Sequence, residues 1–171
     1  PAASPARVTP GLSDAAASDD SDIRNTAHYG TTLTSAGLAI AERTGATGMD
    51  LLGGMVIGYE AAGRIGDARR GGRGGLHASQ LVAFGGAVAV ARLLKLTDQQ
   101  MAHALGIVAT TMGGIAIGTN SWAREYMGSN AAGSGVDAAE AAARGFTVND
   151  DMLGARGGFV DVFGGGRDAV G

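Results

Sequence analysis

The sequence contains no cysteine among its 171 residues. That absence excludes a disulfide framework, a thiolate nucleophile and a metal site built on thiolates. Aromatic side chains are also scarce, at 5% of the chain, and proline occurs three times. The longest apolar runs, residues 81–91 and 104–118, are shorter than the roughly 20 residues that span a bilayer. We therefore expect neither a disulfide-rich domain nor a membrane partner.

Charge is low as well. The formal net charge is −3 at pH 7, which is too close to neutrality to indicate a nucleic-acid partner. The first residues lack the charged start and the apolar run of a secretory signal. These absences predict a cytoplasmic protein with no nucleic acid and no membrane among its partners.

Glycine and other small residues are abundant. Glycine fills 31 positions, and hydrophobic residues make up 45% of the chain. A chain of this length fits one domain that can bury a core. Because small side chains leave little to interdigitate, a core of alanine, glycine and valine requires helices that approach closely.

Proline content and apolar periodicity divide the chain into three parts. Residues 1–26 hold all three prolines and show no apolar periodicity, so we expect an N-terminal arm or loop there. Residues 27–163 carry helical patterns and are expected to form a helical domain. Residues 164–171 show no clear pattern and are assigned to a tail.

Threonines with capping signals recur at regular spacing in the helical part. Thr47 is followed by Asp50 and Thr97 by Gln100, both at the three-residue distance of a capping box. Thr147 lies fifty residues beyond Thr97 and is expected to cap a shorter element. The spacing predicts an all-α fold of three stacked antiparallel helical hairpins. The alternative is a coincidental repeat in a sequence rich in alanine and glycine.

The same patterns place individual helices. The helix after Thr47 is predicted to bury one apolar face. That face consists of Leu52, Met55, Val56, Tyr59 and Gly63. A further helix is predicted from about Ser79, its expected N-cap, to Lys95. The third hairpin is expected to begin near Asn130, after a loop over residues 118–130.

Two histidines occupy matching places ahead of these helices. His28 and His77 lie 19 and 20 residues before the first two capping threonines. Equivalent positions in successive antiparallel hairpins lie at the same end of a bundle. We therefore expect His28, His77 and the loop 119–129, which contains Arg124, to surround one mouth.

These residue types suit acid–base chemistry on an anion, and an acidic cluster upstream adds carboxylates to the set. An imidazole can remove a proton alpha to a carboxylate or protonate a leaving hydroxyl, and nearby positive charge stabilises the enediolate that forms. Helix N-termini and the arginines of the loop 69–73 suit the carboxylates of a substrate. The predicted catalytic residues are His28, His77 and Asp20, and the predicted substrate contacts are Arg124, Arg73 and Ser79.

Each feature also has a purely structural interpretation. Most lone histidines are structural or solvent-exposed, and a short acidic run is usually a solvated surface. A zinc site needs a third ligand, and His103 is predicted on a helix surface. The glycines between positions 71 and 75 follow no strand, so they do not form a dinucleotide fingerprint. We therefore expect neither a cofactor nor a metal.

Two segments carry a resemblance to a known family. They are GMDLLGGMVIGYEAAGRIG, at 48–66, and LHASQLVAFGGAVAVARLLKLTDQQMAHALGIVATTMGG, at 76–114. With them, residues 27–163 resemble the MmgE/PrpD family, which includes 2-methylcitrate dehydratase, cis-aconitate decarboxylase and iminodisuccinate epimerase. The resemblance implies a helical domain that bears the active site of a metal-independent lyase. Such a hydro-lyase acts on a di- or tricarboxylate, by dehydration or by a related decarboxylation or isomerisation.

The resemblance extends to single residues. His77 matches the family histidine that opens the alanine-rich helix, and His28 matches the first residue of the His-Pro-Gly motif, with tyrosine in place of proline here. The first aspartate of the family's Asp-x-Asp-Asp motif falls on Ser18, unless a short deletion gives Asp20 that role. The family lysine falls on Arg124, which keeps the charge but is a poor base.

Length separates this chain from the resembling family, whose members are longer and carry a second, α/β lid domain. The resemblance thus implies that the lid is absent from this chain, and that its partner is a second copy or another chain that completes the enzyme. The alternative function is a non-catalytic or reduced paralogue that pairs with a chain carrying the lid. A third option is a helical scaffold that binds no carboxylate.

Overall fold

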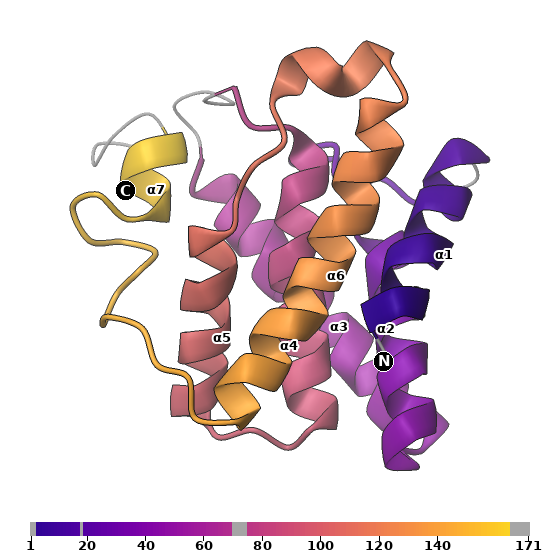
Figure 1. Cartoon of the computed structure of the whole chain (residues 1–171), viewed down its shortest axis with the longest axis vertical. Coiled ribbons are helices and arrows are strands. Elements are labelled where there is room, and N and C mark those ends of the chain that lie inside the picture. Colours follow the sequence, from indigo (N-terminus) through magenta and orange to yellow (C-terminus); the bar gives the residue numbers. More distant parts are fainter. Residues whose placement is uncertain (1–2, 18, 70–74, 165–171) are drawn as a thin grey trace.

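The computed structural model describes residues 3–17, 19–69 and 75–164 of the chain (Figure 1). Regular secondary structure in these ranges is helical, which confirms the predicted all-α fold. The α-helices are α1 (Ala3–Ala15), α2 (Tyr29–Thr44), α3 (Gly48–Asp67), α4 (Val82–Leu93), α5 (Asp98–Thr110), α6 (Ala123–Ala143) and α7 (Phe159–Phe163). The 3₁₀ helices η1 (Ala78–Leu81) and η2 (Ala116–Asn120) precede α4 and α6. None of the described helices combines the length and the apolarity needed to cross a bilayer.

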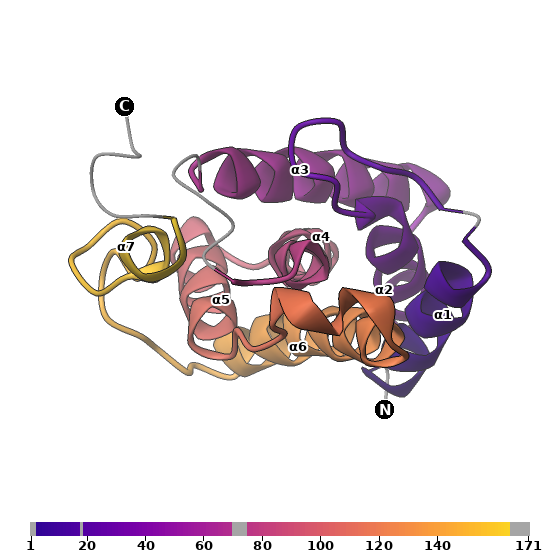
Figure 2. The same ribbon diagram turned by 90° about the horizontal axis from the view of Figure 1, so that it is seen from above.

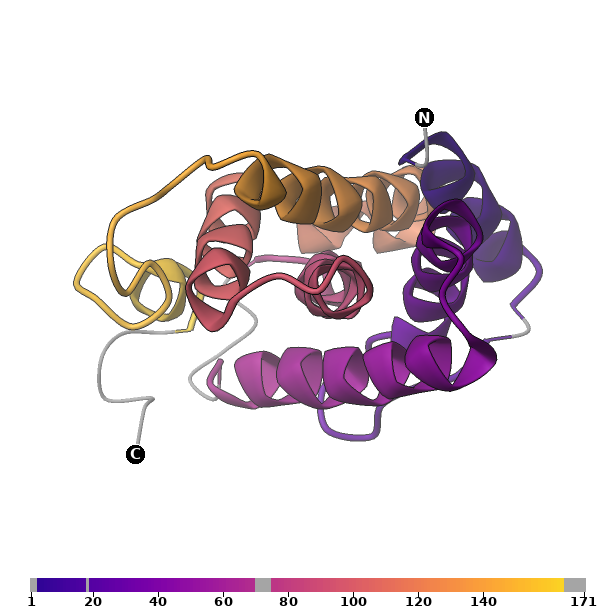
Figure 3. The same cartoon turned by 90° about the horizontal axis from the view of Figure 1, so that it is seen from below.

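Helix α4 runs through the middle of the molecule. In Figures 2 and 3, α3 and α6 flank it on opposite sides, while α2 and α5 contact its remaining sides. Every residue from Val82 to Ala91 is buried. A helix that is apolar all round needs this kind of cover, so α4 forms the centre of the core.

Glycines allow the flanking helices to approach α4. At Gly58 of α3, a Cβ atom would lie 2.6 Å from the carbonyl oxygen of Gly85 in α4. At Gly135 of α6, a Cβ atom would lie 2.5 Å from the carbonyl oxygen of Ala83. These distances leave no room for a side chain. The close helix contacts predicted from the small-residue composition are therefore confirmed.

The two predicted capping boxes are present. The hydroxyl of Thr47 accepts a hydrogen bond from the N–H of Asp50 at 3.2 Å, and the Asp50 carboxylate accepts one from the N–H of Thr47 at 3.0 Å. Thr97 and Gln100 repeat both bonds at the same distances. Helices α3 and α5 thus begin where the sequence predicts, and α2–α3 and α4–α5 form hairpins.

The third repeat departs from the prediction at both of its ends. Helix α6 begins at Ala123 rather than near Asn130, because its first turns contain good helix formers and place Glu125 at the positive end of the helix dipole. Thr147 is exposed and begins no helix. The chain turns instead at Asp151, which has a φ of 54° and accepts a hydrogen bond from the N–H of Gly154.

The N-terminal segment also differs from the expected loop, because residues 3–15 form helix α1. Helix α1 packs against α6 and α2, and it buries Pro10 completely. Arg7 adds an ion pair with Asp137 of α6 at 2.6 Å. These contacts with distant segments stabilise a helix that the local proline content argues against.

The buried face of α3 is not the one predicted. Its buried positions are the small residues Gly54, Gly58, Ala62, Gly63 and Gly66. Of the predicted face, Gly63 is buried and Met55 and Tyr59 are half-buried, but Leu52 and Val56 are 55% and 69% exposed. Because α3 packs closely against α4, its side with the small residues faces the core, and its large side chains face outward.

Candidate active site

The chain brings three predicted site residues together at one end of the helical bundle. His28 immediately precedes α2, His77 immediately precedes η1, and Arg124 lies in the first turn of α6. All three line one pocket, which has a volume of about 230 Å³. The convergence predicted from the spacing of the helix starts is therefore observed.

The His28 ring is oriented by the loop before α2. Its Nδ1 lies 2.5 Å from the carbonyl oxygen of Asp20 and 3.6 Å from the Asp19 carboxylate. Because a carbonyl only accepts, Nδ1 carries the hydrogen and donates it. In the neutral ring, Nε2 is then the nitrogen with a free lone pair, which is the atom that a general base requires.

The His77 ring has the opposite tautomer. Its Nδ1 accepts a hydrogen bond from the backbone N–H of Ser79 at 3.2 Å, so the hydrogen of the neutral ring is on Nε2. The backbone N–H of His77 donates to the carbonyl of Gly114 at 2.8 Å, which fixes the residue at the pocket. In the neutral rings, Nε2 thus carries the lone pair in His28 and the hydrogen in His77.

Arg124 brings positive charge to the pocket, but acidic groups hold its guanidinium. Its Nε donates to both carboxylate oxygens of Glu125 at 3.1 Å, and its Nη2 donates to the carbonyl of Asp14 at 3.2 Å. The hydrogen bond to Glu125 raises the pKa of Arg124. The guanidinium is therefore fixed in place and partly neutralised.

Comparison with known protein families decides the identity of this helical domain. The sequence matches the MmgE/PrpD N-terminal domain over residues 14–170. The chain belongs to the MmgE/PrpD family. No individually curated protein matches it. The family includes lyases, and the fold matches its helical N-terminal domain.

Three other predicted residues of this MmgE/PrpD chain have different positions. Asp20 does not line the pocket; its Oδ1 accepts the N–H of Gly30 at 2.8 Å, at the start of α2. Ser79 is not the N-cap, because His77 takes that place and Ser79 donates its backbone N–H to it. Arg73 lies outside the described residues, as does Ser18. The catalytic and binding roles assigned to this set stay predictions.

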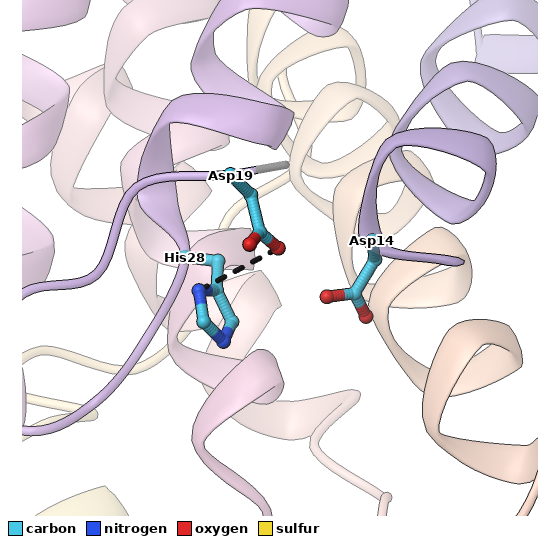
Figure 4. Close-up of side chains that lie close together, drawn as sticks. All are labelled: Asp14, Asp19 and His28. Atoms are coloured by element: carbon cyan, nitrogen blue, oxygen red, sulfur yellow. Dashed lines mark ion pairs between the residues drawn. The ribbon is translucent and has the colours of Figure 1, made fainter. Parts of the chain in front are cut away.

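Two aspartates escaped the sequence prediction, and both lie beside His28. In Figure 4, the carboxylates of Asp14 and Asp19 point toward one another, and the His28 ring lies beside Asp19. Asp14 is only 6% exposed. Burial, together with Glu125 and Asp19, raises the pKa of Asp14 from 3.8 to about 7, against the opposing effect of Arg124. Asp14 was not predicted as a site residue because the residues around it were assigned to a loop, where an aspartate is normally solvated.

The same three side chains have a spacing that suits a cation. One ligand atom from each of Asp14, Asp19 and His28 lies within 4.8 Å of the others. Two features oppose metal binding in the MmgE/PrpD chain: His28 Nδ1 already donates to a carbonyl, and Arg124 lies 3.8 Å from the Asp14 carboxylate. The arrangement therefore favours a shared proton over a metal ion.

Proposed function

We propose that this chain provides the acid–base pair of a lyase that acts on a di- or tricarboxylate. The reaction removes a proton alpha to a carboxylate and eliminates water, or rearranges the skeleton by a related decarboxylation or isomerisation. The observation that carries the proposal is the opposite tautomers of His28 and His77 at one pocket. Membership in a family that includes lyases supports it.

In the proposed step, Nε2 of His28 takes the proton from the carbon atom and becomes an imidazolium. The Nε2–H of His77 donates a hydrogen bond to the departing hydroxyl, which takes up a proton from solvent and leaves as water. The substrate gains a double bond, and His28 returns to its neutral form by releasing its proton. Arg124 faces the same pocket and stabilises the negative charge that develops.

A partner fits this proposal because the rim of the pocket is apolar and exposed. Ile115, Ile117 and Trp122 are 68%, 84% and 80% exposed, and they lie on the segment around η2 that borders the pocket. Exposed apolar side chains that gather in this way are typical of contact surfaces. We propose that a second copy or another chain covers this rim and completes the site.

A non-catalytic chain is the second candidate, and one observation favours it. Arg124 is bound to Glu125 and lies next to Asp14, so little of its positive charge remains for an anionic substrate. A chain of this kind would contribute to an assembly through the apolar rim without turning over substrate itself.

Exchange of the alpha hydrogen in deuterated water, followed by NMR on a panel of di- and tricarboxylates, separates the two candidates. The variants are His28→Gln and His77→Gln, with His103→Gln as control, because His103 does not line this pocket. We expect exchange by the wild type and the control, and a loss of about 100-fold or more in each pocket variant. Exchange that persists in both pocket variants refutes the acid–base pair, and binding without exchange supports the non-catalytic chain.

A further inference from the structure

A second, much smaller cavity lies next to the pocket and shares His28 with it. Its polar lining comes from Asp14, His28, Thr31, Thr32 and Ser79, and its volume is about 10 Å³. A cavity of about this size holds one water molecule, provided that two or more polar groups face it. The cavity meets both conditions.

Two buried oxygen atoms at this cavity need a partner. Asp14 Oδ1 and Thr32 Oγ1 are both inaccessible to solvent and have no hydrogen-bond partner among the described residues. The residues are 6% and 1% exposed. Burying polar atoms without a hydrogen bond costs free energy, and these two line the same small space. One water in this space would give both atoms a partner.

We propose that this cavity binds one water molecule, which hydrogen-bonds to Asp14 and Thr32 and carries protons between Asp14 and His28. Asp14 is then a positioning residue, which acts on the substrate only through His28. This role rests on the acid–base function proposed above for His28. In the transfer that restores the base, the Nε2–H of the His28 imidazolium gives its proton to the water while the water gives one to the Asp14 carboxylate. The products are a neutral imidazole and a protonated carboxyl group, and the water is restored.

The surroundings of Asp14 suit a group that gains and loses a proton near neutral pH. Asp19 and His28 face it from the segment before α2, and Arg124 and Glu125 face it from α6. The carboxylates and burial favour the protonated form, while the guanidinium favours the carboxylate. The resulting pKa of about 7 lies where an imidazole also exchanges protons.

The test follows the ionisation of Asp14 and its effect on His28 in the purified chain. The infrared band of a protonated carboxyl group that disappears in Asp14→Asn reports Asp14, and the ¹⁵N resonances of the imidazole report His28. Thr32→Val removes the hydroxyl that binds the water, whereas Thr32→Ser retains it. Thr34→Val makes the same change at an exposed position of α2 and is the matched control.

We expect Thr32→Val to raise the midpoint of the Asp14 titration by about 0.5 pH unit or more, because the carboxylate loses its hydrogen-bonded water. Thr32→Ser and Thr34→Val should titrate as the wild type does. The His28 resonances should shift over the pH interval in which Asp14 ionises, and this shift should vanish in Asp14→Asn. Equal midpoints in both valine variants, or His28 resonances indifferent to Asp14→Asn, overturn the proposal.

These readouts do not require turnover. A chain that fails to exchange substrate hydrogen refutes the proposed function and leaves the spectroscopic result standing. A chain that exchanges hydrogen and shows no coupling between Asp14 and His28 refutes the water link alone. Wherever turnover is present, the pH profile of kcat/KM should lose its inflection near pH 7 in Asp14→Asn.

Discussion

Replacing Asp14 with asparagine should stabilise the protein at pH 8 and have little effect near pH 4. Asparagine has the shape of the protonated side chain and carries no charge at either pH. The aspartate, in contrast, ionises inside the protein above pH 7, where burial and two neighbouring carboxylates oppose its charge. The variant therefore removes the unfavourable free energy of a buried aspartate charge, which the wild type has only at higher pH.

The size of the effect follows from the pKa. The change from 3.8 to about 7 spans about three pH units, and about 1.4 kcal/mol per unit gives about 4 kcal/mol. Since Asp14 is only 6% exposed, solvent screens little of this. The folded state binds the proton more tightly than the unfolded state does. The contribution of Asp14 to wild-type stability is therefore fully present below pH 3.8 and is lost as the pH rises through about 7.

Urea unfolding followed by far-ultraviolet circular dichroism, from pH 4 to pH 8.5, measures the difference between the two proteins. We expect the advantage of Asp14→Asn to grow by about 4 kcal/mol between pH 4 and pH 8. Asp150→Asn, at an exposed turn, is the control and should change stability by less than about 0.5 kcal/mol. An advantage that stays constant with pH, or an Asp14→Asn protein that is less stable at pH 8, refutes the reasoning.

Three further predictions concern the fold, and thermal or urea unfolding checks each of them. Gly58→Ala should destabilise the protein by about 1–3 kcal/mol, because its Cβ would contact the carbonyl of Gly85, whereas Gly53→Ala in the same helix points into open space and should stabilise by up to about 1 kcal/mol. Thr97→Ala should cost about 1 kcal/mol through loss of the capping box. Arg7→Ala should cost less than about 1 kcal/mol, since both partners of its ion pair are substantially exposed. Equal effects of the two glycine changes would contradict the packing account.

Features that depend on a few neighbouring residues could be predicted from the sequence. The capping boxes at Thr47 and Thr97 require only a threonine and a side-chain acceptor three residues later, and both capping boxes are present in the structure. The meeting of His28 and His77 was predictable because the spacing of the helix starts places them at one end. Local sequence therefore predicted helices α2 to α5 and three residues of the pocket, His28, His77 and Arg124.

Features that depend on distant contacts could not be predicted in this way. Helix α1 is stabilised by α6, more than a hundred residues away in sequence, so its prolines misled a local interpretation. The buried face of α3 depends on how closely α4 approaches, which turned Val56 outward. Asp14 was missed for the same reason, since its burial exists only once α1, α2 and α6 have packed together.

The central position of α4 has a mechanical consequence for the pocket. With neighbours on all its sides (Figure 2) and carbonyl oxygens in contact with glycines of α3 and α6, this helix cannot slide or rotate without disturbing several others at once. His77 is the N-cap of η1, which leads directly into α4, so His77 is held at the N-terminal end of this fixed helix. Among the described segments that border the pocket, the exposed rim around η2 is free of this constraint, whereas the imidazole of His77 keeps its place.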